Sequence, residues 1–164
     1  QAMYYFINGY TSKLGGTEAG VTEPSPNFSP CFGGPFLPRP PQVYAQLLAD
    51  RIREHKANVW LVNTGWSGGP YGVGARMKLA HTRAMIHAIL DGGLAKAKYD
   101  VDPIFGLHIP TSAPNVPDGV LNPRDSWKDK AAYDEKAKDL AKRFRDNDAK
   151  FEMPDKVRAA GPKG

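Results

Sequence analysis

The segment Leu61–Ala84, which reads LVNTGWSGGPYGVGARMKLAHTRA, constrains the fold of this chain more than any other segment. An apolar run is followed by a glycine-rich loop over residues 65–75, and the chain then enters a predicted helix. The succession of strand, glycine loop and helix brings backbone N–H groups close to nucleotides and other anions. The loop is not a Walker A motif, because Ala75 and Arg76 stand where that motif needs lysine and a hydroxyl residue.

The composition sets broad limits on the kind of protein. A length of 164 residues corresponds to one domain with one core. The 17 glycines and 15 prolines predict extensive loops. The formal charge of +5 comes from interspersed residues and not from a basic block. Such a surface attracts phosphate-bearing ligands, and we expect no nucleic-acid partner.

A single cysteine, Cys31, excludes an internal disulfide and is expected to behave as a small buried apolar residue. The sequence contains no apolar run of membrane-spanning length and no leader-like start. We therefore expect a cytoplasmic protein with no membrane contact.

Hydrophobic periodicity and turn residues predict the order of the elements. Residues 4–10 are aromatic and β-prone, with Gly9 at a bend or a close backbone approach. Buried strands are predicted at 58–63 and 104–109, a proline-rich, lid-like loop at 22–41, and turns over 111–125. Helices are predicted over 41–56, 82–91 and 130–148. Their expected core residues are Val43, Leu47, Leu48 and Ile52, then Met85, Ile86, Ile89 and Leu90, and finally Tyr133, Ala137, Leu140 and Phe144.

Arg76 is the residue for which the local sequence most favours a role in ligand binding. A guanidinium at the exit of a glycine-rich loop can bind phosphate through two N–H groups or stack on a flat base. The alternative is an ordinary surface arginine, and the local sequence does not decide between the two. Thr82 is either a plain N-cap or a hydroxyl that also meets a ligand. The four histidines lack metal-ligand spacing, and Glu18 and Glu23 are more simply solvated than catalytic.

Several motifs together resemble the ATP-dependent phosphoenolpyruvate carboxykinases. The resemblance runs in order along nearly the whole chain. The matching segments are FINGYTSKL with GTE from Phe6 to Glu18, TEP and FS with CFG from Thr22 to Gly33, LVNTGW from Leu61, RM from Arg76, TRA from Thr82, NPR from Asn122 and AAGP from Ala159. Gly15 and Ala75 depart from the pattern, and Ala75 replaces a residue that is usually basic.

The resemblance implies an α/β enzyme of gluconeogenesis that converts oxaloacetate and ATP to phosphoenolpyruvate, CO2 and ADP with Mg2+ or Mn2+. It implies that Arg76, Met77 and Thr82 contact ATP near the base and the ribose. The region 17–34 resembles a mobile loop that closes over the site and excludes water.

The resemblance also implies that this chain is a partial, C-terminal piece of the P-loop-type nucleotide-binding domain. The family's P-loop and its metal-binding acidic, lysine and histidine residues lie upstream of the matched motifs. We therefore expect no catalytic residue and no metal ligand in this chain, no activity of the chain alone, and the upstream part of the same enzyme as its partner. The alternative is a non-catalytic fragment or binding module that needs the missing upstream segment, and that binds nucleotide weakly or associates with a polypeptide carrying that segment. Exposed strand edges would promote self-association.

Overall fold

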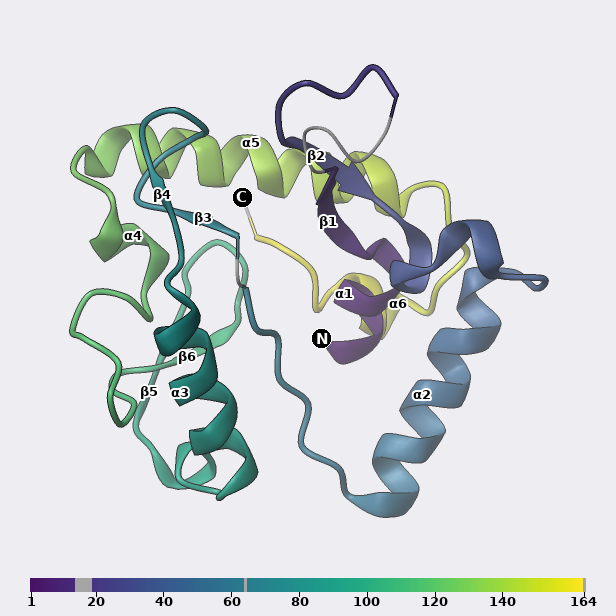
Figure 1. The fold of residues 1–164 in the computed structure, drawn as a ribbon. Coiled ribbons are helices and arrows are strands. Elements are labelled where there is room, and N and C mark those ends of the chain that lie inside the picture. Colours follow the sequence, from purple (N-terminus) through teal and green to yellow (C-terminus); the bar gives the residue numbers. More distant parts are fainter. Residues whose placement is uncertain (14–18, 64, 164) are drawn as a thin grey trace. The chain divides into compact units, whose positions relative to one another are not determined.

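The computed structural model describes residues 1–13, 19–63 and 65–163. Those residues divide into two compact units, one formed by 1–60 with 140–164 and the other by 61–139. Each unit combines helices with two-stranded antiparallel sheets, so the described chain is mixed α and β (Figure 1). The helix α5 (Lys130–Asp148) begins in the second unit and ends in the first, with the bounds that periodicity predicted.

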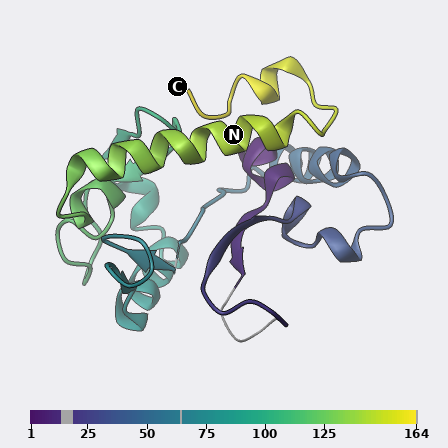
Figure 2. The same cartoon turned by 90° about the horizontal axis from the view of Figure 1, so that it is seen from above.

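The first unit is built around a short N-terminal helix, α1 (Ala2–Asn8). The strands β1 (Tyr10–Lys13) and β2 (Ser25–Phe28) pair as an antiparallel hairpin, with Tyr10 opposite Phe28. Two 3-10 turns, η1 (Pro30–Phe32) and η2 (Gly34–Phe36), lead into α2 (Pro41–His55), and α6 (Asp155–Arg158) follows α5. Figure 2 shows α1 under the C-terminal part of α5.

The expectation of β-type structure at residues 4–10 is wrong, because 2–8 form α1. Tyr4 is fully buried and Tyr5 is nearly so, and both rings lie within 6.2 Å of the Phe144 ring of α5. The rings of Tyr10 and Phe28 also pack on Phe144, at 5.6 and 5.1 Å. A helix places consecutive aromatic residues on this cluster, and that burial overrides the strand propensity of the segment.

Gly9 ends α1 in the left-handed conformation, with φ of 56°. A Cβ atom there would lie 1.7 Å from the Ser29 carbonyl oxygen, so the position requires glycine for space as well as for φ. The Ser29 N–H donates to the Gly9 carbonyl at 3.0 Å. The close backbone approach predicted at Gly9 is confirmed.

The C-terminal segment closes this core with polar contacts. The Tyr4 hydroxyl donates to Asp148 at 3.0 Å, and Arg158 donates to the other carboxylate oxygen at 2.5 Å. Gly161 lies against the Tyr4 ring, where a Cβ would come within 2.4 Å of the ring carbon Cζ. The AAGP motif is therefore a packing motif in this structure.

The segment 22–41 contains mostly turns, as predicted, although β2 gives it one short strand that includes Pro26. Cys31 is half-buried, with φ of 53°, and burial raises the pKa of its thiol. Helix α2 begins at Pro41 as predicted. Of its predicted core residues, Leu47 is 55% exposed, whereas Ala45 is fully buried.

The described part of the second unit contains two hairpins, two complete helices and the first turns of α5. The strands β3 (Trp66–Ser67) and β4 (Ala75–Arg76) form the first hairpin, and β5 (Tyr99–Val101) with β6 (His108–Pro110) form the second. Between the hairpins lie α3 (Leu79–Leu90) and the turn η3 (Leu94–Lys96), and α4 (Pro123–Ser126) precedes α5. Residues 111–122 contain no described helix or strand, in line with the predicted turns.

Three expectations for residues 58–109 need correction. Residues 58–63 form no strand, and Val59 and Leu61 are 48% and 55% exposed, because no described strand pairs with this segment. The strand predicted at 104–109 starts only at His108, since a turn closed by the Gly106 N–H and the Asp102 carbonyl precedes it. Helix α3 starts three residues before Thr82, and its predicted core residues Ile86 and Leu90 are 40% and 78% exposed.

Candidate functional site

The glycine-rich segment 65–75 folds into the β3–β4 hairpin. The Asn63 side chain accepts a hydrogen bond from the Gly65 N–H at 2.9 Å and turns the chain into β3. At the tip, the N–H groups of Val73 and Gly74 donate to the Pro70 carbonyl at 3.0 and 2.9 Å. A Cβ at Gly74 would lie 2.5 Å from the Gly69 carbonyl oxygen, so the two arms approach closely only because glycine stands there.

The loop of the hairpin lies close to α4 where it leaves β3. A Cβ at Gly68 would lie 3.0 Å from the Ser126 carbonyl oxygen, which shows how closely the hairpin backbone approaches α4. Arg124 fixes α4 to α5 through two hydrogen bonds to Asp134, at 2.8 and 3.0 Å, and these hydrogen bonds hold the pKa of that carboxyl below its usual range. The Asn122 side chain caps α4 by accepting from the Arg124 N–H at 3.1 Å. The NPR motif therefore acts as scaffold for the glycine hairpin.

The three predicted ATP contacts all lie on the stretch from β4 into α3. Arg76 is exposed on β4, and its side chain forms no ion pair with a described residue. Met77 follows β4, is half-buried, and donates its N–H to the Gly65 carbonyl at 3.0 Å. Thr82 is half-buried inside the first turns of α3.

Thr82 is not the N-cap of α3, because Lys78 occupies that position. Its backbone N–H already donates to the Lys78 carbonyl at 3.3 Å, as an internal helical residue does. The prediction that Thr82 caps the helix is therefore wrong. Of the two roles considered for Thr82, the ligand hydroxyl is the one that stays as a prediction.

The electrostatic character of this stretch is positive. Residues 75–90 carry Arg76, Lys78 and Arg83 together with two histidines, and no aspartate or glutamate. Helix α3 begins at Leu79 without a side-chain cap, so its first N–H groups remain directed out of the helix end. Side-chain and helix-end charge act in the same direction here and favour an anionic ligand.

Two aromatic residues of the hairpin were not among the predicted site residues. Trp66 and Tyr71 lie edge to face, with ring centroids 5.2 Å apart, and they are 39% and 50% exposed. Trp66 pairs directly with Arg76 across the hairpin. The sequence signal that could have indicated Trp66 and Tyr71 is the presence of two aromatic residues within a glycine-rich loop.

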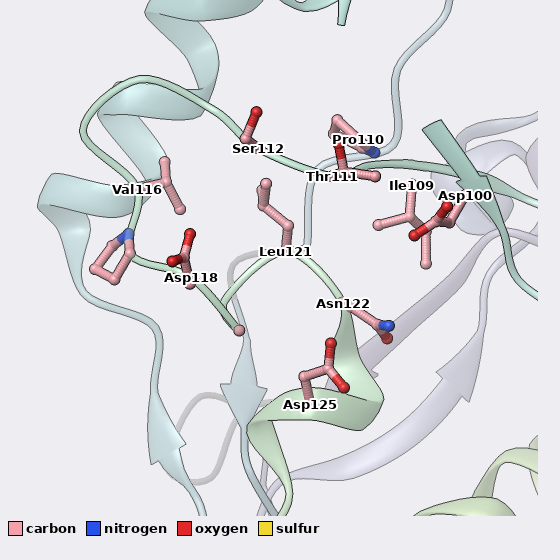
Figure 3. Close-up of a pocket in the computed structure, with 12 residues that line it drawn as sticks. Asp100, Ile109, Pro110, Thr111, Ser112, Val116, Asp118, Leu121, Asn122 and Asp125 are labelled. Atoms are coloured by element: carbon pink, nitrogen blue, oxygen red, sulfur yellow. The ribbon is translucent and has the colours of Figure 1, made fainter. Parts of the chain in front are cut away.

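A cavity of about 90 Å³ lies elsewhere in the same unit, between β5, β6, the loop 111–122 and α4 (Figure 3). Its wall carries the carboxylates of Asp100, Asp118 and Asp125 and no basic side chain. It contains none of the predicted ATP contacts. A wall of that charge disfavours phosphate.

Other predicted features fall partly beyond the described residues. Residues 14–18, which include Gly15 and Glu18, and Thr64 of LVNTGW lie outside the part of the chain that the structure describes. Across the described ranges, no group of three or more histidine, cysteine, aspartate or glutamate side chains could hold a metal ion. None of the helices in those ranges is both long and apolar enough to cross a membrane.

Comparison with known proteins gives the family. A family model described as phosphoenolpyruvate carboxykinase matches residues 1–119. Proteins named phosphoenolpyruvate carboxykinase (ATP) from Caldanaerobacter subterraneus subsp. tengcongensis and Geobacillus kaustophilus are 57% and 61% identical to this chain, over 100% and 92% of its length. A protein named phosphoenolpyruvate carboxykinase (ATP) 2 from Moorella thermoacetica is 56% identical over 99%.

The chain belongs to the phosphoenolpyruvate carboxykinase family, as its motifs indicated. It spans about a third of the length of these curated relatives, with matches that cover 32%, 29% and 31% of them.

Proposed function

We propose that this chain supplies the adenine-side contacts of an ATP-dependent phosphoenolpyruvate carboxykinase, which converts oxaloacetate and ATP to phosphoenolpyruvate, CO2 and ADP. The observation that carries the proposal is the exposed Arg76 beside the uncapped start of α3, on a stretch without carboxylates. In this role Arg76 meets the base or a phosphate, Met77 offers an apolar surface and Thr82 a hydroxyl.

The chain corresponds, in this proposal, to the C-terminal third of the enzyme and to part of its nucleotide-binding domain. The order of the motifs along the chain supports this placement. Divalent metal neutralises phosphate charge when it is bound, and its ligands belong to the remaining two thirds. Among the described residues, no group of three or more histidine, cysteine, aspartate or glutamate side chains could hold it. Without that part the chain does not turn over, because phosphoryl transfer depends on positioning and on charge neutralisation.

Complementation tests both the function and the placement. The chain is mixed with the N-terminal two thirds of the relative from Caldanaerobacter subterraneus, and phosphoenolpyruvate formation from oxaloacetate and ATP is followed in a coupled assay. We expect background rates from either piece and turnover from the mixture. Turnover only with the C-terminal two thirds of the relative would place the chain at the N-terminal end. Turnover by the chain alone would refute the proposal that it needs the remaining two thirds of the enzyme.

The role of Arg76 is tested in the active mixture. Replacement Arg76→Ala removes the exposed cation of the site, and we expect the KM for ATP to rise about tenfold, the loss typical of one charge-assisted contact. Arg51→Ala removes an exposed arginine of α2 that pairs with Glu54, and it serves as the matched control. Equal effects of the two substitutions would count against Arg76 as an ATP contact.

The alternative function is a non-catalytic module that binds nucleotide by itself. The positive β4–α3 stretch is the feature that favours it, since this feature is present without any further polypeptide. Calorimetry with ATP before and after mixing separates the two functions. Binding by the isolated chain with no turnover on mixing would support the module.

A further inference from the structure

We propose that Trp66 is the stacking residue for the nucleotide base, on the face of the β3–β4 hairpin that it shares with Arg76. This inference rests on the proposed function and assigns to the same site a residue that the motif comparison did not.

The register of the hairpin places the two side chains together. Trp66 and Arg76 are directly opposed in the antiparallel pair. Opposed residues of such a pair project their side chains from the same face, with Cβ atoms about 4.5–5.5 Å apart. The indole and the guanidinium therefore project from the same face of the hairpin, where both can contact one flat aromatic ligand.

Met77 lies on the other face of the hairpin. It continues the extended backbone of β4, since its N–H donates to the Gly65 carbonyl at 3.0 Å. Successive residues of extended backbone project to opposite faces. A base that lies flat against Arg76 therefore meets the Trp66 ring on the same face, and the apolar surface that Met77 offers in the proposed function contacts another part of ATP.

The indole is both accessible and held in place. It is 39% exposed, which leaves part of the ring open to solvent. The Tyr71 ring contacts it at a centroid distance of 5.2 Å with an interplanar angle of 90°, so Tyr71 contacts Trp66 edge to face and does not stack parallel to it. A preformed aromatic surface lowers the ordering cost of binding.

Trp127 provides a matched control within the same unit. Its ring packs edge to face on Tyr133 with centroids 5.7 Å apart, as Trp66 packs on Tyr71, but it is not paired with Arg76. Substitution by leucine removes either indole while it keeps apolar volume, and Trp66→Phe keeps an aromatic ring.

The test is a titration of the isotope-labelled chain, mixed with the unlabelled N-terminal two thirds of the relative, with AMP and with ribose 5-phosphate at millimolar concentrations, followed through amide and indole N–H signals. We expect AMP, but not ribose 5-phosphate, to shift the Trp66 indole signal while the Trp127 signal stays in place. Stacking on an aromatic side chain is typically worth one or more factors of ten, so Trp66→Leu should weaken AMP binding about tenfold, whereas Trp66→Phe and Trp127→Leu should change it by less than about threefold.

Two other outcomes separate a failure of the stacking role from a failure of the proposed function. Shifts at Arg76 and Thr82 without any shift of the Trp66 indole, or unchanged affinity in Trp66→Leu, would overturn the stacking role and leave the proposed function intact. No AMP-dependent shift anywhere in residues 65–82 would overturn the stacking role and the adenine-side function together.

Discussion

Replacement of Phe144 by alanine is the most severe test of how the first unit is held together. The Phe144 side chain is 3% exposed, and four other rings surround it, those of Tyr4, Tyr5, Tyr10 and Phe28, with centroids between 5.1 and 6.2 Å away. It joins α5 to α1 and to the β1–β2 hairpin, so its loss leaves a cavity where the three elements meet.

The expected cost follows from burial and ring contacts. Truncation of a buried phenylalanine to alanine costs about 3–5 kcal/mol. Each aromatic pair contributes about 0.5–1.5 kcal/mol beyond the burial of its surface area, and the truncation cost already includes part of this contribution. We therefore expect the upper end of the range, about 4–5 kcal/mol. A domain is stable by only about 5–15 kcal/mol, and Phe144→Ala should therefore leave this unit close to unfolded.

The assay is urea unfolding followed by near-UV circular dichroism, with hydrogen exchange over residues 2–13. Phe36 is 85% exposed in the same unit, and Phe36→Ala, the matched control, should change the free energy of unfolding by less than about 0.5 kcal/mol. Phe144→Leu keeps most of the volume and should lose about 1–1.5 kcal/mol, which stays measurable if the alanine variant does not fold. A loss below about 1 kcal/mol in Phe144→Ala, or one equal to that of Phe36→Ala, would refute the packing argument.

Three further perturbations test other contacts. Gly161→Ala forces a methyl group into the Tyr4 ring and should lower the free energy of unfolding by about 1–3 kcal/mol. Gly33→Ala is the control, because its Cβ would lie 3.9 Å from the nearest atom, and it should lower that free energy only by the backbone cost of replacing glycine. Gly74→Ala should separate β3 from β4, which amide exchange in residues 66–76 would detect, and should also abolish AMP binding. Above pH 10, stability should fall in pH titrations of the unfolding free energy. Burial first, and then Asp148, raise the pKa of the Tyr4 hydroxyl above its unfolded value, so its contribution is complete below that value and is lost as pH rises further.

Each of these three predictions has a result that would contradict it. Equal stability of Gly161→Ala and Gly33→Ala would mean that the tail does not press on Tyr4. Normal exchange protection in Gly74→Ala would show that the hairpin arms tolerate a side chain. Burial also raises the pKa of Tyr10, and that of Tyr133 rises to about 12, so Tyr4→Phe should reduce the alkaline loss of stability without removing it. An unchanged pH dependence in Tyr4→Phe would contradict the assignment.

The sequence alone determined those elements whose formation depends on residues within the element itself. The apolar stripe of α5 and the proline at the start of α2 predicted both helices, because helical spacing and a missing N–H act within a few residues. The motifs also indicated the family and the stretch that contains Arg76, since the order of short motifs is a property of the sequence itself.

Tertiary structure decided what depends on distant partners. The aromatic residues of α1 form a helix and not a strand because Phe144, far along the chain, offers a surface for them. Residues 58–63 have strand character but no described strand beside them, and a strand needs a neighbour to satisfy its backbone. The pairing of Trp66 with Arg76 likewise follows only from the hairpin register, which the close approach at Gly74 makes possible and which no local pattern in the sequence specifies.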